Sequence, residues 1–136
     1  MMVITGHSQG KAMKISEILE ISQGSLLTPY ANPDIEILGG FAGDLMSDVL
    51  ASIQPESVLI TGLSNPQVIR TALIADVRVV IFARGKQPAQ ETIKLAIEEK
   101  LPVISSDLGL YEISGRLLQH GLPSFEKRML HAFDSD

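Results

Sequence analysis

The sequence predicts a three-layer α/β/α domain with a mostly parallel sheet of about four to five strands, built from successive βα units. Three short runs rich in valine and isoleucine, 58–61, 77–83 and 103–105, alternate with two segments of helical pattern. Branching at Cβ suits these side chains to a pleated, buried surface, and strands that alternate with helices form parallel sheets. The run 77–83, VRVVIFA, is almost continuously apolar, which is typical of a strand covered on both faces.

The composition is that of one globular domain, and it excludes several classes of function. Of 136 residues, 45% are hydrophobic, 20% are charged and none is cysteine, so a disulfide framework, a thiolate metal site and a cysteine nucleophile are ruled out. The net charge of −5, with scattered Lys and Arg, argues against nucleic acid and anionic membranes as partners. No apolar run approaches the roughly 20 residues that cross a bilayer, and no signal pattern opens the chain. We therefore expect a cytoplasmic protein.

Residues 1–12 are expected to precede the domain as a flexible extension. The string GHSQG at 6–10 matches the G-x-S-x-G nucleophile elbow, and with Lys11 it comes close to a phosphate loop. Neither motif has its proper context, because the chain is too short for the hydrolase fold and only three residues separate the two glycines. The domain itself is expected over 13–122, followed by a tail or docking helix over 123–136.

In the first half of the domain, helical spacing of isoleucine and leucine predicts a helix over 14–22, with Ser16 as N-cap and Gly24 as stop. The next predicted elements are a strand at 25–28, a strand at 35–38, a glycine turn over 39–43 and a helix over 44–53. This strand–turn–helix order resembles a dinucleotide fingerprint, but Leu38 stands in place of the first glycine. We therefore interpret the glycines as allowing a bulge or close packing.

After residue 57, a unit of strand, polar loop and capped helix occurs three times. The helices of these units are expected to begin at Asn65-Pro66, at Pro88, and at Ser106 or Asp107. The last of them runs over 108–119. This is repeated architecture and not a duplicated sequence.

Candidate ligand-binding residues come from the loops that follow the strands. In an open parallel sheet, right-handed crossovers bring these loops to one edge, where ligands bind. Hydroxyl groups, cations and helix N-termini together favour an anion. The candidates are Thr61, Gly62, Ser64, Asn65, Arg84, Gly85, Lys86, Ser105 and Ser106, with Gly43, Asp44, Asp48 and Asp107 as secondary candidates. The alternative interpretation is that each residue only caps a helix or forms a turn; Asp44 and Asp48 in particular are interpreted first as capping and first-turn acids.

No catalytic or metal-binding arrangement is visible in the sequence. The histidines, His7, His120 and His131, pair with no predicted strand-end acid or serine, and no H-E-x-x-H, EF-hand or two-carboxylate motif occurs. We therefore predict no catalytic residue, no metal and no cofactor.

Between Met13 and about Leu122, the chain resembles the DRTGG domain family. The matching pieces are MKISEILE at 13–20, GDLMSDVL at 43–50, LIT at 59–61 with Asn65, VVIF at 79–82 with Pro88 and Glu91, and LPVISS at 101–106. The literal string Asp-Arg-Thr-Gly-Gly is absent, and the closest turn is Ala83-Arg84-Gly85.

The resemblance implies an α/β domain like the N-terminal domain of HPr kinase/phosphorylase, of a type found beside CBS domains and inside some phosphotransacetylases. It also implies a homodimer or higher homo-oligomer and a regulatory role without catalytic residues to transfer. We thus predict a non-catalytic, ligand-sensing domain that binds an anionic small molecule, such as a nucleotide, at the strand ends. Two alternatives stay open: a dimerising interaction module for a kinase or metabolic enzyme with no small ligand, and a small phosphate-chemistry enzyme that uses Asp44, Asp48 and Asp107.

Overall fold

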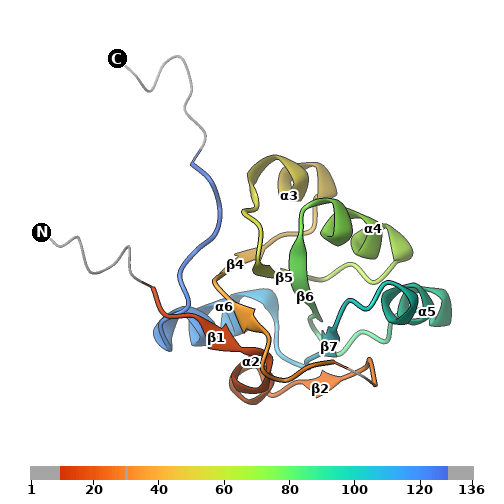
Figure 1. The fold of residues 1–136 in the computed structure, drawn as a ribbon, viewed down its shortest axis with the longest axis horizontal. Helices are drawn as coiled ribbons and strands as arrows, with labels where there is room; N and C mark the ends of the chain where they lie inside the picture. Colours follow the sequence, from red (N-terminus) through yellow and green to blue (C-terminus); the bar gives the residue numbers. More distant parts are fainter. Residues whose placement is uncertain (1–9, 30, 129–136) are drawn as a thin grey trace, which may run out of the picture.

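The structure is a computed structural model that describes residues 10–29 and 31–128. The strands of its main sheet are β2 (Ser25–Leu26), β4 (Gly39–Ala42), β5 (Ser57–Thr61), β6 (Val77–Phe82) and β7 (Val103–Ser105). Within the described residues they lie in the order β2-β7-β6-β5-β4 (Figure 1). The last four are mutually parallel, whereas β2 runs antiparallel to β7 at one edge.

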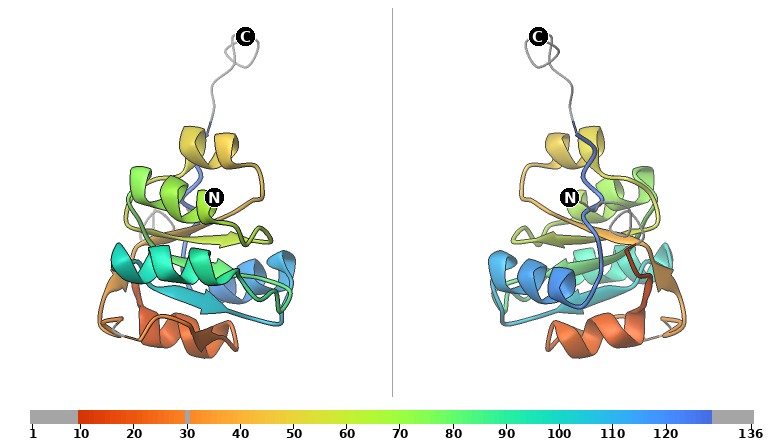
Figure 2. Two further views of the ribbon diagram at one scale, coloured as in Figure 1. Left: turned by 90° about the vertical axis from the view of Figure 1, so that its right-hand side faces the viewer. Right: turned by 90° about the vertical axis from the view of Figure 1, so that its left-hand side faces the viewer.

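Helices cover both faces of this sheet, so the predicted three-layer α/β/α fold is confirmed. The helices are α2 (Ile15–Ile21) and α6 (Leu110–Gln119) on one face, and α3 (Met46–Ser52), α4 (Pro66–Ile74) and α5 (Gln90–Glu98) on the other. Figure 2 shows α4 and α5 in front of the sheet from one side and α6 in front from the other.

The central strands are buried because each supplies side chains to two cores. Along β5, Val58 and Ile60 enter the core beneath α2 and α6, while Leu59 enters the core beneath α3, α4 and α5. All five residues of β5 are buried, and in β6 only Arg78 is half-buried. The near-continuous apolar runs in the sequence therefore reflect strands with no solvent-facing side.

The glycine turn predicted over 39–43 is wrong, because Gly39–Ala42 forms the edge strand β4. It is parallel to β5, with Gly39 opposite Ser57. The strand predicted over 35–38 contributes only β3 (Glu36–Ile37), which pairs antiparallel with β1 (Met13–Lys14) in a separate two-stranded sheet. Glycine has a weak preference for strands, but it is suited to places where another group approaches the backbone closely.

Several helix starts also differ from the prediction. The first residues observed are Ile15 for α2, Met46 for α3, Gln90 for α5 and Leu110 for α6. Lys14, not Ser16, is the N-cap of α2, and its N–H donates to Glu17 Oε1 at 3.0 Å. Gly109 is the N-cap of α6, so neither Ser106 nor Asp107 has the capping role expected for it.

The chain after α6 returns along the outer edge of β4, and we call residues 123–127 the C-terminal strap. Gly40 N donates to Pro123 O at 2.9 Å, and Phe125 N donates to Gly40 O at 2.8 Å. Farther along, Lys127 N donates to Ser52 O at 2.7 Å at the end of α3. The described part of the predicted tail is therefore extended, and residues 129–136 lie outside the described residues.

The two flanks of the domain meet beside α6. Lys11 N donates to Gly121 O at 2.9 Å, and a β-carbon on Gly10 would overlap the ring of Pro123. Most of the 6–10 motif lies outside the described residues. The boundaries expected at 12/13 and 122/123 stay predictions.

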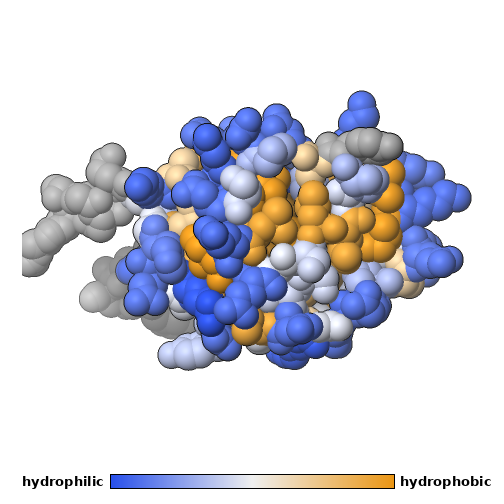
Figure 3. Space-filling view, turned by 90° about the horizontal axis from the view of Figure 1, so that it is seen from below, coloured by the Kyte–Doolittle hydropathy of each residue, from blue (hydrophilic) through white to orange (hydrophobic). Residues whose placement is uncertain are grey.

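Seen from below, apolar side chains gather over the end of the molecule where α2 and β2 lie (Figure 3). Leu26 of β2 is one of the exposed apolar residues of the domain. None of the helices within 10–29 and 31–128 is long and apolar enough to cross a membrane.

Candidate ligand-binding rim

The carboxyl ends of the four parallel strands lie side by side at one edge of the sheet. Backbone hydrogen bonds tie neighbouring ends together, from Gly43 N to Ile60 O at 3.0 Å, from Ala83 N to Thr61 O at 2.9 Å and from Ser106 N to Phe82 O at 3.0 Å. We call this edge the rim, and it comprises residues 43–44, 61–65, 84–86 and 105–107. Most candidate residues from the sequence therefore share one edge of the fold.

Asp44 fastens the loop that follows β5. Its Oδ1 accepts hydrogen bonds from Thr61 Oγ1 at 3.1 Å and from Gly62 N at 2.7 Å. Thr61 Oγ1 in turn accepts the Leu63 N–H at 3.2 Å. The interpretation of Asp44 as a first-turn acid is wrong, because α3 begins at Met46. Within the described residues, the second carboxylate oxygen of Asp44 accepts no hydrogen bond.

Arg84 crosses from the loop after β6 onto the loop after β5. A β-carbon on Gly62 would overlap Arg84 Nη1, so the missing side chain at position 62 makes room for the guanidinium group. The backbone beneath it is fixed, because Arg84 N donates to Leu108 O and Gly85 N donates to Ser106 O, both at 2.8 Å.

The backbone of Arg84 is left-handed, with φ of +64°, and Gly85 follows with φ of +67°. A non-glycine residue in this region costs on the order of 1 kcal/mol, and such residues cluster at functional sites. The other described non-glycine residues with positive φ follow helices or lie in the turn before β5: Gln23, Glu56, Asp76 and Lys100. Arg84 differs from them because it lies just after the carboxyl end of the central strand β6.

The rim carries charges of both signs. The described residues form three ion pairs, Lys14–Asp34, Arg78–Glu56 and Arg116–Glu112, and neither Arg84 nor Lys86 belongs to them. Both cations are exposed. Asp107 lies beside Gly85, where a β-carbon would come 2.8 Å from its Oδ1. Two cations and two carboxylates therefore border the same edge.

Ser106 has a structural role within this edge. It is buried, and its Oγ donates to Ser22 O at 2.6 Å and accepts the Leu108 N–H at 3.2 Å. The hydroxyl thus joins the end of α2 to the loop before α6. Ser105 is half-buried in β7, opposite Ser25 of β2.

The remaining candidates lie at or near the starts of helices. Asn65 is the N-cap of α4 but makes no side-chain capping bond, and the same is true of the N-caps of α5 and α6. Among the described residues, the N-cap side chains therefore leave the first N–H groups of these helices without acceptors. Ser64 O accepts a hydrogen bond from Thr92 Oγ1 at 3.0 Å, and Asp48 lies in the first turn of α3. No group of three Asp, Glu or His in the described part of the chain is placed to hold a metal ion.

Two features of this edge, the hydrogen bonds of Asp44 and the left-handed backbone of Arg84, were not predicted from the sequence because they depend on residues far away in the chain. Asp44 meets Thr61 from 17 positions away, and the left-handed backbone begins at Arg84, one residue before the glycine that would be expected to adopt it. The local signals were the placement of both residues after predicted strands and, for Arg84, the glycine that follows it.

A family model named the DRTGG domain matches residues 17–120. The chain belongs to the DRTGG domain family. The family resemblance noted in the sequence is thus confirmed, while the particular likeness to HPr kinase/phosphorylase stays a prediction. No curated protein matches the chain.

Among solved structures, this DRTGG domain is similar to the CBS and DRTGG domains of the regulatory region of Clostridium perfringens pyrophosphatase. That structure is a complex with its activator, diadenosine tetraphosphate. The TM-score is 0.64 at 13% identity, and the match covers 85% of this chain and 50% of that one. The DRTGG chain thus spans about half the length of the structure it matches, and the likeness shows a shared fold.

Proposed function

We propose that this DRTGG domain is a non-catalytic, ligand-sensing regulatory domain that binds a small anionic molecule, a nucleotide in particular, at the rim. The placement of Arg84 carries the proposal. Its guanidinium lies over the bare backbone of Gly62 and, among the described residues, forms no ion pair. An exposed cation fixed by a left-handed turn is a preformed anion contact.

The chemistry around Arg84 suits a nucleotide better than a simple anion. A guanidinium group binds phosphate through two parallel N–H donors, and the uncapped starts of α4, α5 and α6 add N–H groups that favour negative charge. Asp44 keeps one carboxylate oxygen free of bonds to the described residues, and a carboxylate accepts hydrogen bonds from ribose hydroxyls. The cation and the helix N–H groups at the rim thus suit the phosphates of a nucleotide, and the carboxylate suits its ribose hydroxyls.

The relatives support a sensing role. The domain belongs to the DRTGG family, and a solved structure that shares its fold is a regulatory region in complex with its activator, diadenosine tetraphosphate. We infer that this chain also transmits the presence of a nucleotide rather than transforming it.

Thermal-shift measurements of the purified chain test the proposal with adenosine mono-, di- and triphosphate, diadenosine tetraphosphate and inorganic phosphate. A ligand at 100 times its Kd adds about 2.7 kcal/mol to the free energy of unfolding, so at least one nucleotide should raise Tm by several degrees. The variant Arg84→Gly keeps the left-handed backbone and removes the guanidinium, and it should abolish the shift.

The matched control is Lys100→Gly. Lys100 is also exposed, basic and left-handed, with φ of +57°, but it follows α5 and lies outside the rim. It should keep the nucleotide shift. No shift of the native chain with any of these ligands, or equal loss in both variants, would contradict the proposed site.

A further inference from the structure

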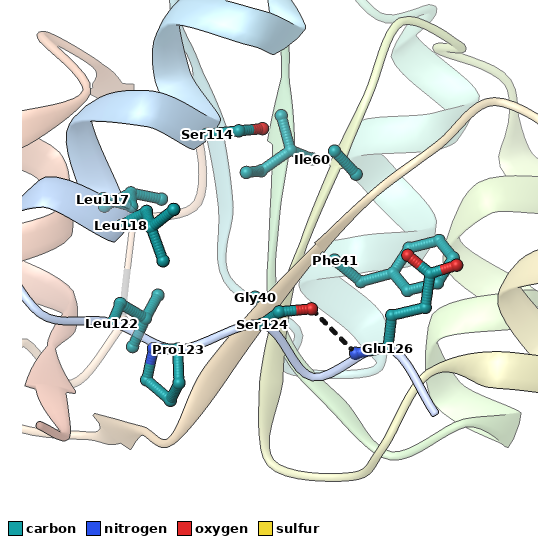
Figure 4. Close-up of a pocket in the computed structure, with 11 residues that line it drawn as sticks. Gly40, Phe41, Ile60, Ser114, Leu117, Leu118, Leu122, Pro123, Ser124 and Glu126 are labelled. Atoms are coloured by element: carbon teal, nitrogen blue, oxygen red, sulfur yellow. Dashed lines mark hydrogen bonds between the residues drawn. The ribbon is translucent and has the colours of Figure 1, made fainter. Parts of the chain in front are cut away.

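A hollow of about 210 Å³ lies between α6, β4 and the C-terminal strap (Figure 4). It exists because the two residues of β4 that face α6 have little or no side chain. A β-carbon on Gly40 would lie 3.4 Å from Val58 and 3.5 Å from Leu122, and both of these residues belong to the core beneath α6. Ala42 is two positions along the strand and faces the same way. Neither residue of β4 therefore fills the space beside the helix.

Most of the lining of this hollow is apolar. The apolar residues are Phe41, Ile60, Leu117, Leu118, Leu122 and Pro123. Leu118 is 63% exposed, so part of this lining is in contact with water. A ligand that covers it gains from the hydrophobic effect, which is roughly proportional to the apolar area removed from water. The hollow therefore favours a ligand that is itself largely apolar.

One hydroxyl in the wall of the hollow has no partner. The Oγ of Ser114 is buried, forms no hydrogen bond to the described residues, and points from α6 toward Ile60 (Figure 4). A serine inside a helix can bond back to the carbonyl oxygen four residues earlier, but within the described residues Ser114 forms no such bond. A buried polar group without a partner destabilises the fold. The free hydroxyl therefore favours a ligand with a polar atom at this point.

The size of the hollow suits a single ring. An apolar cavity of about 150 Å³ holds benzene, whereas sites for drug-sized ligands span about 300–1,000 Å³. The volume of about 210 Å³ lies between these values, so the hollow has room for one ring with one or two small substituents and is too small for a nucleotide. It also shares no residue with the rim. A ligand bound here is therefore different from the one proposed for the rim.

The charge at the hollow disfavours an anionic ligand. Glu126 of the strap lines it and is exposed. The described lining includes no cation, and Glu126 belongs to none of the three ion pairs of the described residues. A carboxylate on the ligand would be repelled by this side chain, whereas an ammonium group would be attracted to it. In this respect the hollow is the opposite of the rim, where Arg84 favours phosphate.

We propose that this hollow is a second ligand site, and that it binds a small uncharged or cationic phenol, of which p-cresol and tyramine are examples. The ring occupies the space beside Gly40 and Ala42, and the phenol hydroxyl forms a hydrogen bond with Ser114 Oγ. An amino group, where the ligand has one, lies toward Glu126. The site does not depend on nucleotide binding at the rim, so Arg84→Gly should leave phenol binding unchanged.

NMR titration of the full chain with two matched ligands tests the role of Ser114. Toluene and p-cresol share the ring and the methyl group, and p-cresol adds the hydroxyl. The native chain should bind p-cresol about fivefold more tightly than toluene, which is the effect of one ordinary net hydrogen bond. Ser114→Ala should remove this difference. The same variant should raise the Tm of the free chain, because it removes the unpaired hydroxyl and because alanine favours the helix.

A second variant and the NMR signals themselves locate the site. Ala42→Leu enlarges a side chain at the wall of the hollow and should abolish binding of both ligands. The matched control is Ala51→Leu, because Ala51 is also exposed but lies on α3, outside the hollow; this variant should bind normally. In the native chain, p-cresol should shift the amide signals of Gly40 and Ser114 but not that of Gly62 at the rim.

Three further phenols test the charge and the source of the ligand. Tyramine should bind at least as tightly as p-cresol, and para-hydroxyphenylacetate more weakly than either. N-acetyltyrosinamide, which carries the peptide groups of a tyrosine within a protein, should also bind more weakly than p-cresol, and tighter binding would assign the hollow to a partner protein instead.

Four results would overturn the proposal. The first is a native chain that binds none of these phenols at concentrations up to the solubility of toluene. The second is a preference for p-cresol over toluene that persists in Ser114→Ala. The third is phenol binding that survives Ala42→Leu, and the fourth is equal affinity for para-hydroxyphenylacetate and tyramine.

Discussion

The ring of Phe125 lies directly against the backbone of Gly39, where a β-carbon would overlap three atoms of the ring. This contact joins the C-terminal strap to the edge strand β4. Next to this contact on β4, Gly40 forms backbone hydrogen bonds with the strap. The edge of the sheet is thus closed by an aromatic ring that fits only because residue 39 has no side chain.

Gly39→Ala should therefore lower the free energy of unfolding by about 1–3 kcal/mol, as overpacked substitutions do. Gly40→Ala is the matched control, because a β-carbon there would lie 3.4 Å from Val58 and 3.5 Å from Leu122, in ordinary contact. Urea denaturation measures both. Combining Gly39→Ala with Phe125→Leu should recover part of the loss, and equal losses at positions 39 and 40 would show that the ring does not set the cost.

Gly62→Ala should displace the Arg84 guanidinium without removing its charge. The atom in the way is the end of a flexible side chain, so the free energy of unfolding should change by less than about 1 kcal/mol. Nucleotide affinity should fall about tenfold, because a displaced guanidinium loses its two-donor contact with phosphate. Calorimetric titration with the nucleotide that stabilises the native chain gives the affinity. Gly109→Ala, where a β-carbon meets nothing within 4 Å, should bind normally.

Ser106→Ala should lower the free energy of unfolding by about 1–3 kcal/mol, because Ser22 O and Leu108 N lose a buried partner. Ser105→Ala removes the neighbouring hydroxyl, which forms no side-chain hydrogen bond to the described residues. This variant should change the free energy of unfolding by less than about 0.5 kcal/mol. Chemical denaturation of the two variants separates the roles. Similar effects at both positions would contradict a special role for Ser106.

Asp44→Ala should destabilise the domain by about 1–3 kcal/mol, because Thr61 Oγ1 and Gly62 N lose a charged acceptor. Asp44→Asn keeps an acceptor oxygen and should lie between Asp44→Ala and the native chain. Asp48→Ala, in the first turn of α3, should cost at most about 1 kcal/mol through the helix dipole. Thermal unfolding of the three variants provides the order, and a larger loss at position 48 would refute it.

The sequence indicates the central strands well because their evidence is local. The valine, leucine and isoleucine side chains at 58–60, 79–81 and 103–104 are buried between two layers of helices, and a strand buried on both faces has a continuously apolar sequence. The rim followed from the same signal, since parallel strands end at one edge. These parts of the fold needed no knowledge of what packs against them.

The misinterpreted parts depend on partners far away in the chain. Gly39-Gly40 looked like a turn, but it is a strand because β5 lies on one side and the strap on the other. Asp44 looked like a helix acid, yet it accepts hydrogen bonds from the end of the next strand. Contacts across such separations produce no periodic pattern in the sequence near either residue, because they depend on the residue at the other end of the contact.

The strap has a mechanical consequence. The backbone hydrogen bonds from the strap to Gly40 and Ser52 follow one another along the chain. A force that pulls on a sequence joined after the strap therefore breaks these bonds one after another. Only then does the load reach the Lys11–Gly121 bond and the sheet. Ser124 and Glu126 of the strap line a hollow that α6 and β4 also border (Figure 4). Peeling the strap would therefore remove one wall of that hollow while the five-stranded core stays closed.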